Sequence, residues 1–117
     1  MIVARPVAEL QVFKAEFFKA LAHPLRIRIL EFLLEGERSV QELQAELSLE
    51  QPIVSQQLAV LRAKNIVGAR KEGTTVRYAV RDPRLGELLA VARRIFNAHL
   101  IGTQAMLREL RREGRGR

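Results

Sequence analysis

Hydrophobic residues recur at helical spacing along most of the chain and at strand spacing over one short stretch. Leu10, Phe13, Phe17 and Leu21 are three or four residues apart, which predicts an amphipathic first helix over residues 8–21. The run 25–34 is apolar on more than one face, so the second helix is expected to be largely buried. His23-Pro24 separates these helices because proline suits a first helical turn, and Glu35-Gly36 ends the second.

A helix-turn-helix is predicted over residues 39–64. Ser39 and Glu42 have the spacing of a capping box, in which each side chain accepts a hydrogen bond from the other's backbone N–H. This box opens a short third helix, residues 48–52 form a turn, and Pro52 begins a fourth helix. The residues expected to point inward are Val40, Leu43, Leu47, Val54, Leu58 and Leu61.

The apolar period changes to two after Ile66. Residues 66–71 and 75–80 are predicted to be two strands of a hairpin, closed by Asp82-Pro83. A final helix of roughly 40 Å, at ~1.5 Å per residue, is predicted over 84–112, and residues 113–117 are expected to be a disordered basic tail. The predicted fold class is mainly α with a small β-hairpin, in one winged-helix domain spanning 1–117.

Charge is unevenly distributed along the 117 residues. The net charge is +7, with +5 in residues 62–81, +3 in residues 108–117 and −4 in residues 35–50. A basic excess favours a polyanionic partner, and nucleic acid before a membrane surface. No apolar run approaches the ~18 residues of a membrane span and no signal peptide is recognisable, so we expect a cytoplasmic protein with no membrane partner.

Residue types exclude several kinds of chemistry. The chain has no cysteine, so disulfides, thiolate metal sites and cysteine nucleophiles are impossible. It has two histidines, no glycine-rich phosphate loop, no Ser/His/Asp set and no convincing carboxylate pair. We therefore expect no enzyme activity, no cofactor and no metal site.

The predicted elements match a device for binding duplex DNA. The second helix of a helix-turn-helix fits the major groove and its early residues reach base edges. Glutamine can pair with adenine in bidentate fashion, and isoleucine can contact a thymine methyl group. The candidate recognition residues are Gln51, Pro52, Ile53, Ser55, Gln56, Gln57 and Arg62.

The hairpin supplies a candidate wing with polar and basic residues near its tip, namely Arg70, Lys71, Thr74, Thr75 and Arg77. If the loop is Gly73-Thr74, Arg70 and Arg77 lie directly opposite each other. Like charges in that position repel, so a structural reason for the pair is weak. A DNA phosphate lying across the hairpin would relieve the repulsion.

Several motifs together resemble the ArsR/SmtB family of winged-helix bacterial repressors. They cover about residues 12–80 and comprise Leu21–Leu30, Ser39–Leu43, Val54–Arg62, Val67–Gly73 and Val76–Tyr78. The resemblance implies a homodimer built on the first and last helices, an inverted-repeat operator, and release when a ligand binds. It also implies base contacts by Gln51, Ser55, Gln56 and Gln57. Glu50, Pro52 and Ile53 depart from the small polar residues usual in that family, which leaves the base preference open.

The metal sites known in that family are not matched. Its Cys-Val-Cys site would fall on Ser39-Val40-Gln41, and its last-helix sites need paired histidines where this chain has only His99. Sensing through thiol oxidation is excluded because no thiol exists. The effector therefore remains open between an organic ligand, a partner protein, control by the regulator's own abundance, and no effector.

The last helix carries a heptad seam suited to helix pairing. Its members are Leu85, Leu88, Ala92, Ile95, His99, Gly102 and Met106, and Phe13 and Phe17 extend the expected dimer surface on the first helix. Gly102 costs about 1 kcal/mol relative to alanine in a helix, which a close helix crossing would compensate. His99 is either a hydrogen-bonded interface residue or part of a pH or ligand switch.

Two alternatives to a regulated repressor remain. A non-specific winged-helix nucleic-acid binder would show similar affinity for any duplex and a steep salt dependence. A helix-mediated protein-interaction module would not need the basic hairpin.

Overall fold

The computed structural model describes residues 4–115, and their side chains from 8 to 114. It divides into two units, Met1–Asp82 and Pro83–Arg117, each described by itself below. Among residues 4–115, the first unit contains four helices and three strands, and the second contains one helix. In chain order the elements are α1 Ala4–Leu21, α2 Pro24–Glu35, β1 Arg38–Ser39, α3 Val40–Leu47, α4 Gln51–Ala63, β2 Val67–Glu72, β3 Thr75–Val80 and α5 Arg84–Arg115.

Local signals at the helix ends explain most of these boundaries. His23 caps α2, its Nδ1 accepting from the Leu25 N–H over 3.1 Å, and Pro24 follows in the first turn. Ser39 caps α3 through the predicted capping box, with Ser39 Oγ 3.1 Å from the Glu42 nitrogen and Glu42 Oε1 2.8 Å from the Ser39 nitrogen. Ser48, with a positive φ of 56°, ends α3 and begins the turn to α4. The predicted helix-turn-helix is thereby confirmed.

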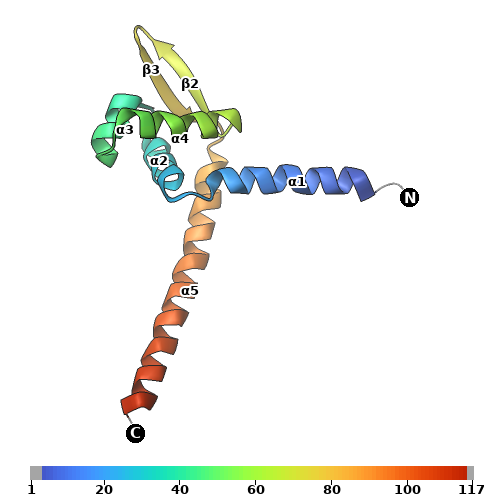
Figure 1. Ribbon diagram of the computed structural model, residues 1–117, viewed down its shortest axis with the longest axis vertical. Coiled ribbons are helices and arrows are strands. Elements are labelled where there is room, and N and C mark those ends of the chain that lie inside the picture. Colours follow the sequence, from blue (N-terminus) through green and yellow to red (C-terminus); the bar gives the residue numbers. More distant parts are fainter. Residues whose placement is uncertain (1–3, 116–117) are drawn as a thin grey trace. The chain divides into compact units, whose positions relative to one another are not determined.

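The core of the first unit lies where α2, α3 and α4 meet the hairpin of β2 and β3 (Figure 1). Burying one large aliphatic side chain stabilises a fold by roughly 2 kcal/mol, so the aliphatic side chains buried in this core hold α4 firmly in place. The fully buried side chains are Ile29, Leu30, Leu43, Val54, Leu58, Leu61 and Val67. Val40, which was expected inward, is only half-buried.

The sheet has three antiparallel strands in the order β1-β3-β2, and β1 was not predicted. Its two residues, Arg38 and Ser39, pair with Tyr78 and Arg77 of β3. The hairpin loop is Gly73-Thr74, and Gly73 has a φ of 64°. Glycine at the first loop position with positive φ is typical of a two-residue hairpin turn of type II′.

Four elements have boundaries that differ from those expected, and one of them is α4, which begins at Gln51 rather than Pro52. The first helix begins at Ala4 rather than residue 8, and β2 covers Val67–Glu72 rather than 66–71. The last helix continues to Arg115, so residues 113–115 are helical and not the expected disordered tail; 116–117 lie outside the described residues. None of the helices described within 4–115 is long and apolar enough to cross a membrane.

Candidate nucleic-acid interface

The outer face of α4 presents polar side chains while its inner face is buried. Gln51, Pro52 and Gln56 are exposed and Ile53 is 40% exposed. Gln51 Nε2 donates to Ser55 Oγ over 2.9 Å, one turn further along the helix. The structure therefore brings these predicted recognition residues to one exposed end of α4.

Gln57 is placed differently, because it is held by Arg26 of α2. Arg26 Nη1 donates to Gln57 Oε1 over 2.9 Å, Nε donates to the Ala20 carbonyl over 2.6 Å, and Nη2 donates to the Lys19 carbonyl over 3.3 Å. Bidentate pairing with adenine would require the Gln57 carbonyl oxygen to leave Arg26. Sequence reasoning missed Arg26, since its partners lie six to thirty-one residues away.

The hairpin pairs Arg70 directly with Arg77, as the two-residue loop predicts. Successive side chains of a strand point to opposite faces. Arg70 and Arg77 therefore share one face, whereas Lys71 and Tyr78 share the other. Lys71 and Thr74 are exposed, and Thr75 is half-buried.

The counter-charge for this arginine pair comes from the chain itself, which corrects the expectation that a structural reason for the pair is weak. Glu37 Oε1 lies 2.7 Å from Arg70 Nη2 and 3.5 Å from Arg77 Nε. Arg70 also pairs with Glu72 at 3.3 Å, and Arg77 with Glu42 at 3.3 Å. The repulsion is relieved within the protein, and it no longer argues for a phosphate at this position.

These contacts shift the ionisation of the groups involved. The hydrogen bond from Arg70 holds the pKa of Glu37 below its ordinary value, with a further contribution from Arg77. The backbone N–H of Ser39, followed by the charge of Arg77, lowers the pKa of Glu42. The hydrogen bond to Glu37 likewise raises the pKa of Arg70. The network therefore favours the charged form of each group.

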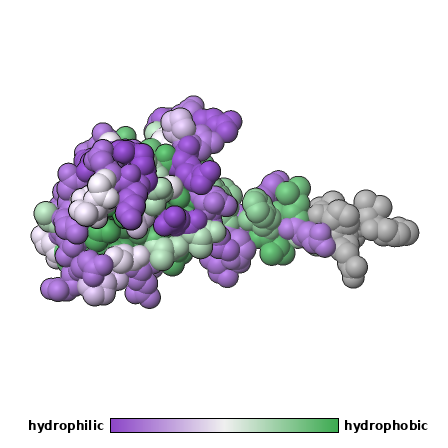
Figure 2. All heavy atoms as spheres, turned by 90° about the horizontal axis from the view of Figure 1, so that it is seen from above, coloured by the Kyte–Doolittle hydropathy of each residue, from purple (hydrophilic) through white to green (hydrophobic). Residues whose placement is uncertain are grey.

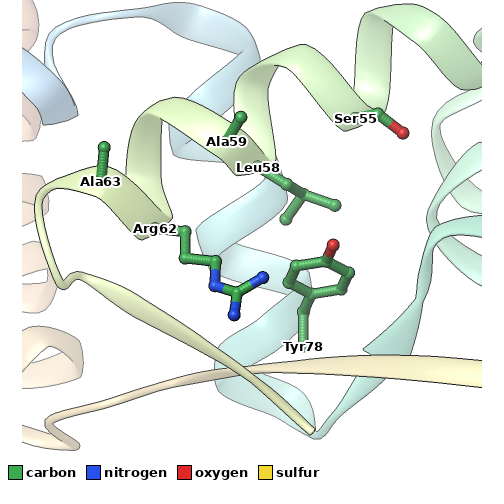
Figure 3. Close-up of a pocket in the computed structure, with 6 residues that line it drawn as sticks. All are labelled: Ser55, Leu58, Ala59, Arg62, Ala63 and Tyr78. Atoms are coloured by element: carbon green, nitrogen blue, oxygen red, sulfur yellow. The ribbon is translucent and has the colours of Figure 1, made fainter. Parts of the chain in front are cut away.

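A hollow of about 310 Å³ lies between α4 and β3, on the opposite face of the hairpin from Glu37. Figure 3 shows Arg62 extending from α4 towards the ring of Tyr78, with Ser55 further along the same helix. The remaining lining residues are Leu58, Ala59 and Ala63. No carboxylate is among the described residues that line this hollow.

The helices expected to form a dimer each expose apolar residues. In α1, Phe13 is 74% exposed and Phe17 half-buried, and Figure 2 shows hydrophobic residues gathered on the projecting part of this helix. In α5, Leu85 is buried and Ala92 half-buried, whereas Leu88, Ile95 and Met106 are 36%, 61% and 63% exposed. His99 and Gly102 are also exposed.

The two histidines have different surroundings. His23 is the cap of α2, which agrees with a structural role. The carbonyl of His99 accepts from Thr103 Oγ1 over 3.0 Å, and its ring is exposed on α5. Within the described residues, no group of three His, Asp or Glu side chains is arranged to hold a metal ion.

Comparison with known proteins identifies the family. The model for bacterial regulatory proteins of the arsR family matches residues 23–68. The chain is 50% identical over 102 residues to the HTH-type transcriptional regulator Rv0081 of Mycobacterium tuberculosis, covering 86% of this chain and 90% of that protein. The crystal structure of Rv0081 superposes with a TM-score of 0.74, covering 80% of this chain and 94% of that one.

Two further relatives agree with this identification. The biofilm growth-associated repressor of Agrobacterium fabrum is 40% identical over 84 residues, covering 72% of each chain. A homodimeric winged helix-turn-helix DNA-binding domain, Mb0332 from Mycobacterium bovis, is 31% identical with a TM-score of 0.72, covering 80% of this chain and 86% of that one. These relatives are regulators of transcription and not enzymes. The chain belongs to the arsR family of bacterial regulatory proteins and is a transcriptional regulator with a winged helix-turn-helix DNA-binding domain.

Proposed function

We propose that the protein is a dimeric repressor that binds a specific inverted-repeat operator and is released by a signal other than thiol oxidation. The observation that carries this proposal is the exposed polar end of α4, where Gln51 and Gln56 are exposed to solvent while Val54 and Leu58 anchor the helix. A rigidly held helix with exposed amide side chains suits base readout in the major groove.

The dimer is supported by the apolar residues that α1 and α5 expose. A soluble monomer rarely exposes contiguous apolar patches larger than a few hundred Å². In α5, the exposed residues include Ile95, Phe96, Leu100, Ile101 and Met106, at 55–66% of their accessible surface. A second copy covers them by helix pairing, and the homodimeric relative Mb0332 has the same fold. Leu85 is already buried, so the pairing surface begins at Leu88.

The proposal includes repression because the relative from Agrobacterium fabrum is a repressor. The absence of cysteine removes thiol oxidation and thiolate metal ligation as release signals. An organic ligand or a partner protein remains as the class of signal.

The test is selection of bound duplexes from random and genomic DNA, followed by footprinting of the best sequence. We expect an inverted repeat with half-sites about 10 base pairs or a multiple apart, protected by a dimer. Equal recovery of all sequences would instead identify a non-specific binder and overturn the proposal. In a matched pair of variants, Gln56→Ala should change base preference at one position of each half-site, whereas Lys14→Ala on α1 should not.

A further inference from the structure

The basic side chains near α4 and the hairpin fall into two groups, those already paired within the protein and those without a partner. Arg70 and Arg77 are paired with Glu37, Glu42 and Glu72, and Lys64 lies 3.5 Å from Glu16. Arg62 and Lys71 make no side-chain ion pair or hydrogen bond among the described residues. A phosphate contacting Arg62 therefore displaces no carboxylate, whereas one contacting Arg70 must compete with Glu37.

Arg62 of α4 and Lys71 of β2 also lie on the same side of the hairpin, the one that α4 covers. Tyr78 lines the hollow beneath α4 together with Arg62, and Lys71 points to the same face of the hairpin as Tyr78. Arg70 and Arg77 point to the opposite face, where Glu37 lies. The hairpin itself therefore separates Arg62 and Lys71 from the carboxylate of Glu37.

The hollow itself offers the donors that a phosphodiester needs. Arginine has five N–H donors arranged for phosphate oxygens, and the Tyr78 hydroxyl can donate one more hydrogen bond. Figure 3 shows the Arg62 guanidinium beside the Tyr78 ring below α4, with Leu58 forming part of the apolar wall and Ser55 further away on the same helix.

We propose that Arg62 and Tyr78 form a seat for one backbone phosphate of the DNA duplex, and that Arg70 and Arg77 serve the fold of the wing. This inference rests on the DNA binding proposed above and assigns one phosphate contact within it. The sequence alone suggests that the hairpin arginines, Arg70 and Arg77, contact phosphate. In the structure these two are paired with carboxylates, whereas Arg62 at the end of α4 is not.

Charge-matched variants separate direct contact from the general field of the protein. Arg62→Gln, Arg70→Gln and Arg81→Gln each remove one positive charge, and Arg81 lies near Gly68 on the Glu37 face of the hairpin. Binding to a fixed duplex of random sequence is measured from 50 to 300 mM KCl. Each phosphate neutralised by the protein contributes about 0.9 to the slope of log K against log salt, so Arg62→Gln should reduce the slope of a dimer, which has two such contacts, by about 2. Arg70→Gln and Arg81→Gln should change it by less than half as much. Arg62→Lys should retain the slope.

A second measurement locates the phosphate. Single methylphosphonate substitutions in the best selected duplex remove one backbone charge at a time. One such substitution per half-site should lower the DNA affinity of the wild-type protein roughly tenfold and leave the affinity of Arg62→Gln unchanged. This is the expected result if Arg62 and the substituted phosphate are the two partners of one contact. Tyr78→Phe, which loses only the hydroxyl, should weaken binding several-fold while leaving the salt slope nearly unchanged.

The inference is overturned if Arg62→Gln retains the wild-type slope, if the three variants reduce it equally, or if the methylphosphonate effect persists in Arg62→Gln. These outcomes differ from failure of the proposed function. Absence of sequence preference in the selection would refute the specific repressor, but the slopes on a random duplex would still assign the phosphate contact. Far-ultraviolet circular dichroism of each variant verifies that the helices are intact.

Discussion

Arg26 should stabilise the fold because its guanidinium joins α2, the helix that carries it, to both α1 and α4. It bonds the Ala20 and Lys19 carbonyls at the end of α1 and Gln57 in the middle of α4. A hydrogen bond to a charged group contributes roughly 1.5–3 kcal/mol, but Arg26 is only half-buried and its three bonds are not additive. The Ala20 bond dominates, since Ala20 is 4% exposed and water reaches its carbonyl poorly. We therefore expect Arg26→Met to lower the free energy of unfolding by about 2 kcal/mol per chain.

Urea unfolding followed by circular dichroism measures this loss, at equal chain concentration for every variant because dimer stability depends on concentration. Unfolding entropies of ~2.1 cal/mol/K per residue convert 2 kcal/mol into a lower melting temperature by about 8 °C. Arg26→Lys retains the charge but not the planar set of donors, and should recover less than half of the loss. The control is Arg28→Met on the same helix, where an exposed arginine lies 5.8 Å from the Phe32 ring and contributes at most about 1 kcal/mol. Equal losses for Arg26→Met and Arg28→Met would refute the bridging role.

Three further outcomes follow from individual contacts. Ser39→Ala removes the cap of α3 and should cost about 1 kcal/mol in urea unfolding, while Ser39→Thr, which keeps the hydroxyl, should cost clearly less; equal losses would rule out capping as the cause. Because the pKa values of Glu37 and Glu42 are lowered on folding from 4.5, their contribution to stability is present above that pH and is lost as pH falls through the folded values. The free energy of unfolding should therefore decline on acidification below about pH 4.5, less steeply in Glu37→Gln, and identical pH profiles would argue against the network. Ile95→Glu should convert a dimer to a helical monomer in sedimentation velocity, and a variant that stays dimeric would exclude this part of α5 from the interface.

The sequence predicts the elements whose signals are local. The capping box of α3, the proline in the first turn of α2 and the glycine of the hairpin loop each act within a few residues, and each is found where expected. The alternation of residues 75–80 and the register of Arg70 with Arg77 follow from the same short-range rules. The strand β1 was missed because two residues are too short to show a period of two.

Contacts between distant residues account for the part of the site that could not be predicted. Glu37 reaches Arg70 across 33 residues and the Arg77 guanidinium across 40, and no periodic pattern in the sequence links them. Arg26 and Gln57 are 31 residues apart. The acidic stretch 35–50 was interpreted as a cap residue and a solvated surface, whereas two of its carboxylates neutralise the wing.

Net charge therefore overstates the number of cations that can meet DNA phosphates. Residues 62–81 contain six basic side chains, and Lys64, Arg70 and Arg77 among them are paired with carboxylates of the same chain. Of the three others, Arg62 of α4 and Lys71 lie on the side of the hairpin that α4 covers, and Arg81 lies on the opposite side. Counterion release counts direct phosphate contacts rather than formal charges, while the long-range field that steers encounter depends on every charge. If the protein binds DNA as proposed, pairing within the wing would let a strongly basic protein attract DNA in general and yet form few phosphate contacts. The proposed base contacts of α4 would then supply a larger share of the binding energy.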